Sequence, residues 1–354
     1  GGSAILSTGA GTLTLEGTGG NGTSSNQGVL LNNSQVSSVT GAISIKGKGG
    51  NGSGDANHGI YAHTGAQITS TGSATITLEG TGGASGSSTG DHGILLNGAT
   101  TRVIGSTGAI SLTGTGAGAN AWGVALENGG HVLTSNNADI SIEATGAGGN
   151  AAFRVIYANA HVGVNSTLHP TATGGNITIT TDSNNWDGGL MLKSAGILTI
   201  KPRSNGSPVQ IGASGSSATS LNLRAADIGN MADGFSEIII GSTAAGNITV
   251  PGAVTFTDPL RILTGGSLTI NQALNTGGNR LALLSTGATT QGANGRITAG
   301  SLRLGGNGNF TLEHASNSVN TVAKNGTGFV RLRNAGALTV GSVDTISGVT
   351  GSTV

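Results

Sequence analysis

Four residues that can act as metal ligands lie in two related segments of the chain. Asp55 and His58 precede Gly59, and Asp91 and His92 precede Gly93. Imidazole nitrogens and carboxylate oxygens are common zinc ligands, but a metal site needs three or four ligands that converge on one point. Only two histidines and loop aspartates are available here. We therefore expect a solvated row of side chains, with no metal and no cofactor.

A pair of carboxylates points to a second kind of chemistry. Glu16 and Glu79 occupy equivalent positions of the repeat described below, and Lys46 lies between them. Two strand spacings separate the glutamates by roughly 9.6 Å, which is near the carboxylate separation of an inverting glycosidase. A lysine between them would keep both ionised, whereas a general acid needs a raised pKa. We expect an exposed row of salt bridges here and no catalysis.

Aromatic side chains offer a third chemistry, the binding of sugars. Trp122 and Trp186 both lie just before expected strands, and an exposed ring there could stack on a sugar. The commoner use of such a tryptophan is to cover the apolar side of a coil. Four residues share one position in successive repeats: Gln27, His58, His92 and Trp122. Glycan contact stays open, and the binding residues are unknown.

Other catalytic constellations are missing from the sequence. Polysaccharide lyases and galacturonases that use β-helices cluster Asp, Arg or Lys on adjacent coils of one groove. Here the aspartates are scattered along the whole chain without a basic cluster, and cysteine is absent, which excludes thiol catalysis and disulfides. We assign no catalytic residue and expect no enzymatic activity.

A repeat slightly longer than thirty residues positions these side chains. The same alternating strand recurs as Leu13-Thr14-Leu15, Ile43-Ser44-Ile45, Ile76-Thr77-Leu78, Ile110-Ser111-Leu112, Ile140-Ser141-Ile142 and Ile177-Thr178-Ile179. The starting positions differ by 30, 33, 34, 30 and 37 residues. A fixed period of short alternating strands is typical of a solenoid, because one repeat cannot bury its apolar side alone.

Each repeat carries two further strands. The second strands are expected at Val29, Ile60, Ile94, Val124, Val155 and Leu190, and the third strands at Val36, Ile68, Val103, Val132, Val162 and Ile197. Three strands and three turns make one coil of a parallel β-helix. The strong preference for right-handed crossovers predicts a right-handed helix, here of about a dozen coils. We expect long coils with Gly-rich loops over 1–200 and a continuing β-helix of shorter coils over 201–354.

Composition limits the partners. The 15 basic and 15 acidic residues balance, so no positive surface is available for nucleic acid. No apolar run reaches the length of a membrane span.

The chain opens in the middle of the repeat pattern, without a signal peptide. We therefore expect a processed product or a piece of a longer chain. Asn-x-Ser/Thr motifs, such as those at Asn21 and Asn51, leave glycosylation open.

Three segments of the second half resemble a known family. Ile297–Leu304, Asn317–Ala323 and Gly336–Val343 are similar to the large haemagglutinin-type exoproteins of Gram-negative bacteria. These include filamentous-haemagglutinin-like adhesins exported by two-partner secretion and related autotransporter passengers. The resemblance implies a β-helical fibre at the bacterial cell surface, usually without enzymatic activity, and an outer-membrane transporter as a partner during export.

Three functions follow from this reading. Adhesion to glycans or other cell surfaces and self-association into an extracellular fibre or lattice both fit a non-enzymatic structural solenoid. A carbohydrate-active β-helix enzyme, of the polysaccharide lyase or glycosidase type, is the alternative. We see no polar cap at either end of the sequence, so we expect the terminal strands to pair with further sequence or with neighbouring subunits.

Overall fold

The architecture is that of a parallel β-helix, as the repeat predicts. A computed structural model describes residues 2–83, 90–147, 152–217 and 219–351 of the chain. The chain divides into two compact units, Gly1–Gly196 and Ile197–Val354. The only α-helix of the described residues is α1 (Ala225–Gly229). No helix in those residues is long and apolar enough to cross a membrane.

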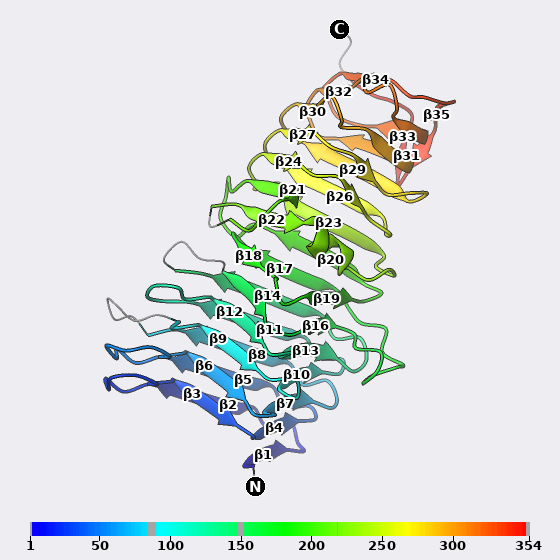
Figure 1. Cartoon of the computed structure of the whole chain (residues 1–354). Helices are drawn as coiled ribbons and strands as arrows, with labels where there is room; N and C mark the ends of the chain where they lie inside the picture. Colours follow the sequence, from blue (N-terminus) through cyan, green and yellow to red (C-terminus); the bar gives the residue numbers. More distant parts are fainter. Residues whose placement is uncertain (1, 84–89, 148–151, 218, 352–354) are drawn as a thin grey trace. The chain divides into compact units, whose positions relative to one another are not determined.

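After β1, the first unit stacks six coils, and each coil adds one strand to each of three parallel sheets (Figure 1). Sheet I holds β2 (Leu13–Thr18), β5 (Ile43–Lys48), β8 (Ile76–Thr81), β11 (Ile110–Thr115), β14 (Ile140–Thr145) and β17 (Ile177–Thr181). Sheet II holds β3 (Val29–Asn32), β6 (Ile60–His63), β9 (Ile94–Asn97), β12 (Val124–Glu127), β15 (Phe153–Ile156) and β18 (Asn184–Asn185). Sheet III holds β1 (Ala4–Ser7), β4 (Gln35–Ser38), β7 (Gln67–Ser70), β10 (Arg102–Gly105), β13 (His131–Thr134), β16 (Ala160–Gly163) and β19 (Leu190–Lys193).

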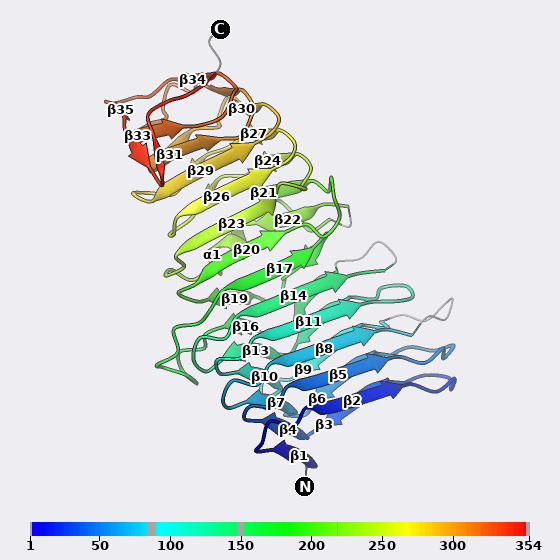
Figure 2. The ribbon, with the colours of Figure 1, turned by 180° about the vertical axis from the view of Figure 1, so that it is seen from behind.

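The register of sheet I is the one that the repeat predicts. The first residues of the repeated strands pair from coil to coil: Leu13, Ile43, Ile76, Ile110, Ile140 and Ile177. The four central isoleucines are at most 2% exposed. Stiff β-branched side chains fill this interior column at low entropic cost, and the alternate residues face outward. Figure 2 shows the strands of sheet I side by side.

In the last two coils of this unit, part of the sequence-based strand assignment is wrong. Leu190 lies on β19 of sheet III, paired with β16, and Ile197 begins the next first strand. The second strand of the sixth coil is the short β18, where Asn184 pairs with Phe153. Because β18 contains no aliphatic residue, its sequence carries no strand signal. In the fifth coil, β15 starts two residues earlier than expected, with Phe153 opposite Val124.

In the first four coils, a glycine brings the end of the first strand close to the start of the second, whereas Ala144 and Thr181 occupy this position in the last two coils. A Cβ added to Gly47 would lie 2.0 Å from the carbonyl oxygen of Gly59, and one added to Gly80 would lie 2.1 Å from that of Gly93. No side chain fits between two backbones at this separation, so glycine is required at these positions. The Gly-rich segments therefore form the narrow edge of each coil.

The second unit is also a parallel β-helix, with shorter coils. Its first strands are β20 (Ile197–Lys201), β23 (Glu237–Ser242), β26 (Leu260–Thr264), β29 (Arg280–Ser285), β31 (Ile297–Gly305), β33 (Ser318–Lys324) and β35 (Thr339–Val340). Its second strands are β21 (Val209–Ala213), β22 (Leu221–Arg224), β24 (Ile248–Val250), β27 (Leu268–Ile270), β30 (Thr289–Gln291), β32 (Phe310–Leu312) and β34 (Val330–Leu332). Third strands are β25 (Val254–Thr255), β28 (Leu274–Asn275) and the leading residues of β31 and β33.

Coil length in the second unit is short and regular after one long coil. Ile238, Leu260, Leu281, Leu302 and Val322 stack at intervals of 22, 21, 21 and 20 residues. Leu198 pairs with Ile238, 40 positions further along the chain, and this coil includes α1 and the extra strand β22. The short coils agree with expectation, whereas the 40-residue coil was not predicted. The right hand of the helix stays a prediction.

A hairpin that the sequence analysis did not predict follows β35. It consists of the antiparallel strands β36 (Ser342–Val343) and β37 (Ile346–Ser347). The backbone then pairs with β33: the N–H of Lys324 donates to the carbonyl oxygen of Gly348 at 2.9 Å, and the N–H of Thr350 donates to that of Lys324 at 3.0 Å. The segment after β35 therefore supplies backbone hydrogen-bond partners to Lys324 of β33.

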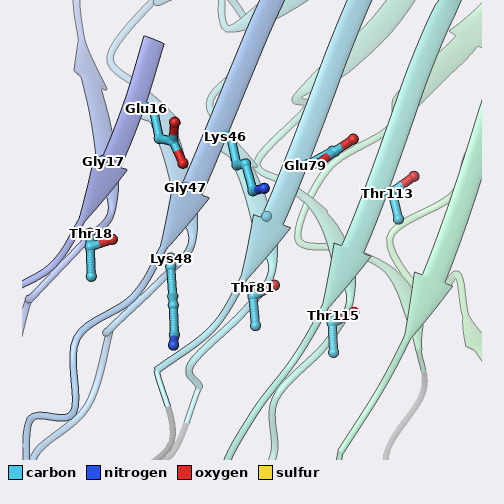
Figure 3. A pocket seen from close by; sticks show the side chains of 11 residues that line it. Glu16, Gly17, Thr18, Lys46, Gly47, Lys48, Glu79, Thr81, Thr113 and Thr115 are labelled. Carbon is cyan, nitrogen blue, oxygen red and sulfur yellow. The ribbon is translucent and has the colours of Figure 1, made fainter.

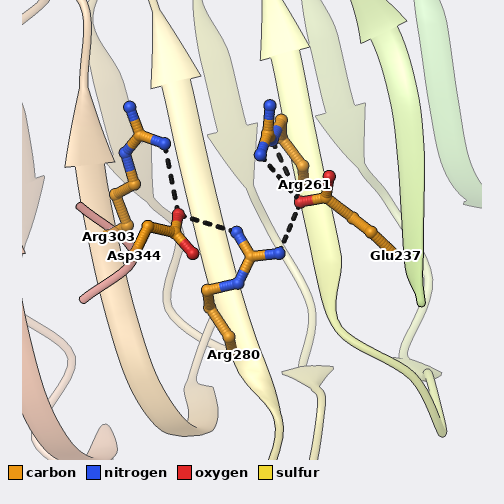
Figure 4. Close-up of polar contacts among 5 residues, drawn as sticks. All are labelled: Glu237, Arg261, Arg280, Arg303 and Asp344. Carbon is orange, nitrogen blue, oxygen red and sulfur yellow. Dashed lines mark hydrogen bonds and ion pairs between the residues drawn. The ribbon is translucent and has the colours of Figure 1, made fainter. Parts of the chain in front are cut away.

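An ion-pair network fastens the hairpin to the second unit (Figure 4). Asp344, in the hairpin turn, accepts hydrogen bonds from Arg280 at 2.8 Å and from Arg303 at 3.1 Å. Arg280 also pairs with Glu237 at 2.5 Å, and Glu237 pairs with Arg261 at 3.0 Å. The five side chains are between 9% and 27% exposed, so solvent screens these pairs only in part.

Candidate functional site

Two rows of outward side chains border a shallow depression on sheet I (Figure 3). One row is Glu16, Lys46, Glu79 and Thr113, and the other is Thr18, Lys48, Thr81 and Thr115. Gly17, Gly47 and Gly80 lie between the rows. The parallel register places equivalent side chains about 4.8 Å apart. The surface therefore presents hydroxyl, ammonium and carboxylate groups in a regular array across four coils.

The charged side chains of this array do not pair with one another. Glu16, Lys46 and Glu79 stack in register as expected. Within the part of the chain that the structure describes, however, none of the three makes a side-chain hydrogen bond or an ion pair. The expected row of salt bridges is therefore wrong, and the carboxylates and the ammonium group are left to solvent or to a ligand.

The arrangement of the two glutamates does not by itself make an acid–base pair. Glu16 and Glu79 lie in coils two apart with Lys46 between them. All three side chains are exposed. A general acid is kept protonated by an apolar surrounding, and these exposed positions do not provide one. The depression is better suited to binding than to proton transfer.

A ladder of stacked rings runs along the loop side of sheet II. His58 stacks on His92 at 4.9 Å between ring centroids, and His92 stacks on Trp122 at 4.1 Å. The guanidinium group of Arg154 lies 3.6 Å from the centre of the Trp122 ring and closes the ladder by a cation–π contact. The predicted stacking of His58, His92 and Trp122 is thus confirmed, but the expected solvation is wrong because both histidines are 5% exposed. The arginine was not predicted.

Backbone hydrogen bonds fix both histidines as neutral rings. The N–H of His92 donates to Nδ1 of His58, and the N–H of Trp122 donates to Nδ1 of His92, both at 3.2 Å. An Nδ1 that accepts a hydrogen bond places the proton of the neutral ring on Nε2. Burial lowers the pKa of His58 to about 4. Burial, with the nearby His58 and Arg154, lowers the pKa of His92 to about 2.

The two aspartates do not join the histidines. Asp91 is fully buried and accepts a hydrogen bond from the N–H of Asn57 at 2.8 Å, and the side chain of Asn57 in turn accepts one from the N–H of Asn26 at 3.1 Å. This polar ladder joins three coils. Asp55 is exposed on the loop. Among the described residues, no three His, Cys, Asp or Glu side chains are grouped as metal ligands.

The two tryptophans differ from the sugar-stacking arrangement considered for them. Trp186 is 2% exposed and packs edge-on against Phe153 in the core, at 5.8 Å between centroids. Trp122 has His92 on one side and Arg154 on the other. Neither ring offers a free face to a sugar.

Sheet III carries a basic cluster that sequence reasoning missed. Arg102 pairs with His131, and the N–H of His161 donates to Nδ1 of His131 at 3.0 Å. Burial, with His161 and Arg102 nearby, lowers the pKa of His131 to about 4. Burial and Arg102 also lower the pKa of His169. The spacing of 102, 131 and 161 matches the repeat and could have revealed this column.

Comparisons with known proteins add no assignment: the chain matches no protein-family model, no curated protein and no solved structure.

Proposed function

We propose that the chain belongs to a non-enzymatic extracellular solenoid that acts as a surface adhesin or as a segment of a matrix fibre. The observation that supports this proposal is the array of unpaired polar side chains across four coils of sheet I. Each coil contributes one polar side chain to each row, so the array suits a partner that itself repeats, such as a polysaccharide or a second copy of the chain. A catalytic site instead concentrates its groups around one reacting atom.

Adhesion and self-assembly are separated by two measurements on the same material. Light scattering over a range of concentrations, with negative-stain microscopy, detects end-to-end or lateral association of copies. Retention on immobilised polysaccharides or on whole cells detects adhesion. A protein that stays monomeric at all concentrations and is retained by no surface would contradict both forms of the proposal.

Export to the bacterial cell surface, by two-partner secretion through an outer-membrane transporter, is part of the same proposal and rests on the resemblance of the second half to haemagglutinin-type exoproteins. We expect protease added to intact cells that express the full-length protein to digest it while cytoplasmic markers stay intact. Protection of the protein until the cells are lysed would oppose this location.

A carbohydrate-active enzyme is the second candidate, because Glu16 and Glu79 border the same depression. Incubation with a panel of polysaccharides, followed by assays for new reducing ends and unsaturated products, tests it. We expect no turnover. Turnover that disappears in Glu16→Gln or Glu79→Gln would overturn the non-enzymatic proposal, however well the protein also binds surfaces.

A further inference from the structure

The tyrosine and tryptophan side chains outside the core gather on the outer side of sheet II. The chain contains two tyrosines and two tryptophans. Trp186 is buried in the core, whereas Tyr61, Trp122 and Tyr157 lie on strands of sheet II or next to them. Aromatic residues make up 3% of the sequence. Core packing does not explain why three of these four side chains share one outer face.

Tyr157 has a backbone conformation that a tyrosine rarely adopts. Its φ is +71°, in the turn after β15, and its side chain is 75% exposed. The equivalent turn residues of the preceding coils also have positive φ: Asn33, Thr64, Gly98 and Asn128. Glycine and asparagine tolerate this conformation, whereas a bulky side chain is strained there. Because the ring is exposed, it makes no packing contacts that would offset the backbone strain. Strain of this kind points to a functional contact of the side chain.

Tyr61 is held rigidly on the same face. Its ring stacks on His63 at 4.4 Å between centroids and meets His58 edge-on at 5.2 Å. These contacts fix the orientation of the ring before any ligand arrives, which lowers the entropic cost of binding. Tyr61 belongs to the second coil and Tyr157 to the fifth, so about three coil spacings, roughly 14 Å, separate their strands.

Polar side chains lie on this face beside the two tyrosines. Nε of Arg154 is buried and makes no hydrogen bond to the described residues. The carboxyl group of Glu127 makes no hydrogen bond or ion pair with them either. The side-chain amide of Asn128, in the turn after β12, donates to the side-chain oxygen of Asn97 at 3.0 Å. Arg154 and Glu127 carry opposite charges, so the face as a whole is close to neutral.

We propose that the outer face of sheet II binds an extended neutral polysaccharide that runs across the coils, with Tyr61 and Tyr157 against sugar rings and Glu127 and Arg154 on sugar hydroxyl groups. Sugars present apolar C–H faces to aromatic rings and hydroxyl groups to charged side chains, and this face combines both. The ligand spans several sugar units because the tyrosines are three coils apart. This inference rests on the proposed adhesive function and names its ligand class and site.

A neutral polymer fits this face better than a polyanion. Among the residues named on this face, Arg154 is the only arginine or lysine, and the negative charge of Glu127 opposes its positive charge. Burial lowers the pKa of His58 and of His92, so both rings are uncharged. A polyanion would need several cations to gain affinity by counterion release. The dependence of the affinity on sodium chloride concentration therefore separates the two ligand classes. The affinity for a neutral sugar should change little with salt, whereas that for a polyanion should fall.

The test is a titration of the full chain with cellohexaose, xylohexaose and chitohexaose, followed by NMR or calorimetry. We expect at least one of these neutral hexasaccharides to bind. Tyr157→Asn should weaken that binding about tenfold, the loss of one aromatic contact, while it raises the Tm because asparagine tolerates the turn. Tyr157→Phe keeps the ring and should bind within about twofold of the parent chain.

Ala56→Asn is the matched control, because Ala56 also has positive φ, +65°, but lies in the loop before β6 and is none of the residues assigned to the ligand. It should leave hexasaccharide binding unchanged. Equal binding by Tyr157→Asn and the parent chain, a lower Tm for that variant, or no binding of any hexasaccharide would each overturn the inference. Such outcomes leave the non-enzymatic function standing, since that proposal fails on polysaccharide turnover, or on the absence of both self-association and surface retention, and not on this titration.

Discussion

Single side chains in the interior columns of the first unit carry much of its stability. Ile76 is fully buried and pairs with an isoleucine on either side, at Ile43 and Ile110. Its neighbour Thr77 faces outward on the same strand. The two positions therefore differ in burial while they share the same strand, backbone and sheet, so they form a matched pair for mutation.

We expect Ile76→Ala to lower the free energy of unfolding by about 2–5 kcal/mol, because it removes buried methyl groups and leaves a cavity between two coils. Thr77→Ala should change it by less than about 1 kcal/mol. Urea titration followed by circular dichroism measures both. Equal losses for the two variants would show that the interior column does not dominate packing.

The buried neutral histidines predict a loss of stability in acid. The unfolded chain binds protons at histidine near pH 6.5, whereas burial holds the folded pKa of His58 near 4 and that of His92 near 2. The unfolded state therefore binds more protons below pH 6.5, and stability falls as the pH falls. At pH 5 each histidine should cost about 2 kcal/mol relative to pH 7.5.

Glutamine variants check the origin of this pH dependence, because Gln27 occupies the same position in the first coil. His58→Gln and His92→Gln should flatten the fall in Tm between pH 7.5 and pH 5. An unchanged slope in the double variant would assign the acid lability to other groups, such as His131.

At the scale of the element, the close approach of first and second strands in the first four coils favours glycine at the end of the first strand. A Cβ at Gly80 would meet backbone of the adjacent segment, whereas one at Gly9 would meet nothing within 4 Å. Gly80→Ala should therefore destabilise the protein by about 1–3 kcal/mol, and Gly9→Ala should be close to neutral. Thermal melts measure both variants. Similar Tm values for Gly80→Ala and Gly9→Ala would contradict the close backbone approach at Gly80.

The hairpin after β35 should loosen when its ion pairs are removed. Asp344→Asn weakens the contacts to Arg280 and Arg303, each worth about 0–1 kcal/mol at this partial exposure. We expect faster amide exchange in β36 and β37, measured by mass spectrometry, with little change in the global Tm. Glu313→Gln, a change at an exposed position of the same unit, should leave exchange unaltered. Unchanged exchange in Asp344→Asn would mean that backbone pairing alone holds the hairpin.

Elements with strict periodicity were predictable from the sequence, and elements that break it were not. The Ile-x-Ile strands at regular intervals gave the register of sheet I, because each repeats the same apolar side. Asn184 and Asn185 form a strand without an apolar residue, and only the neighbouring coil defines it. Arg154 reaches the ring ladder from a strand position different from that of Trp122, so spacing alone could not place it.

At the scale of the whole molecule, the described residues contain no grouped metal ligands, and stability should come from stacked coils. We expect EDTA to leave the Tm of the full chain unchanged. A loss of several degrees, restored by added zinc, would contradict this expectation and make the histidine row a metal site.

The parallel register also sets the distance between Tyr61 and Tyr157 by the number of coils between them. Each coil contacts only its neighbours, so an inserted copy of one coil between β8 and β11 would leave the interior columns continuous. The same insertion would move Tyr157 away from Tyr61 by one further step of about 4.8 Å. Gain or loss of repeats can thus retune the length of polymer that the two rings span, without redesign of a single contact in the core.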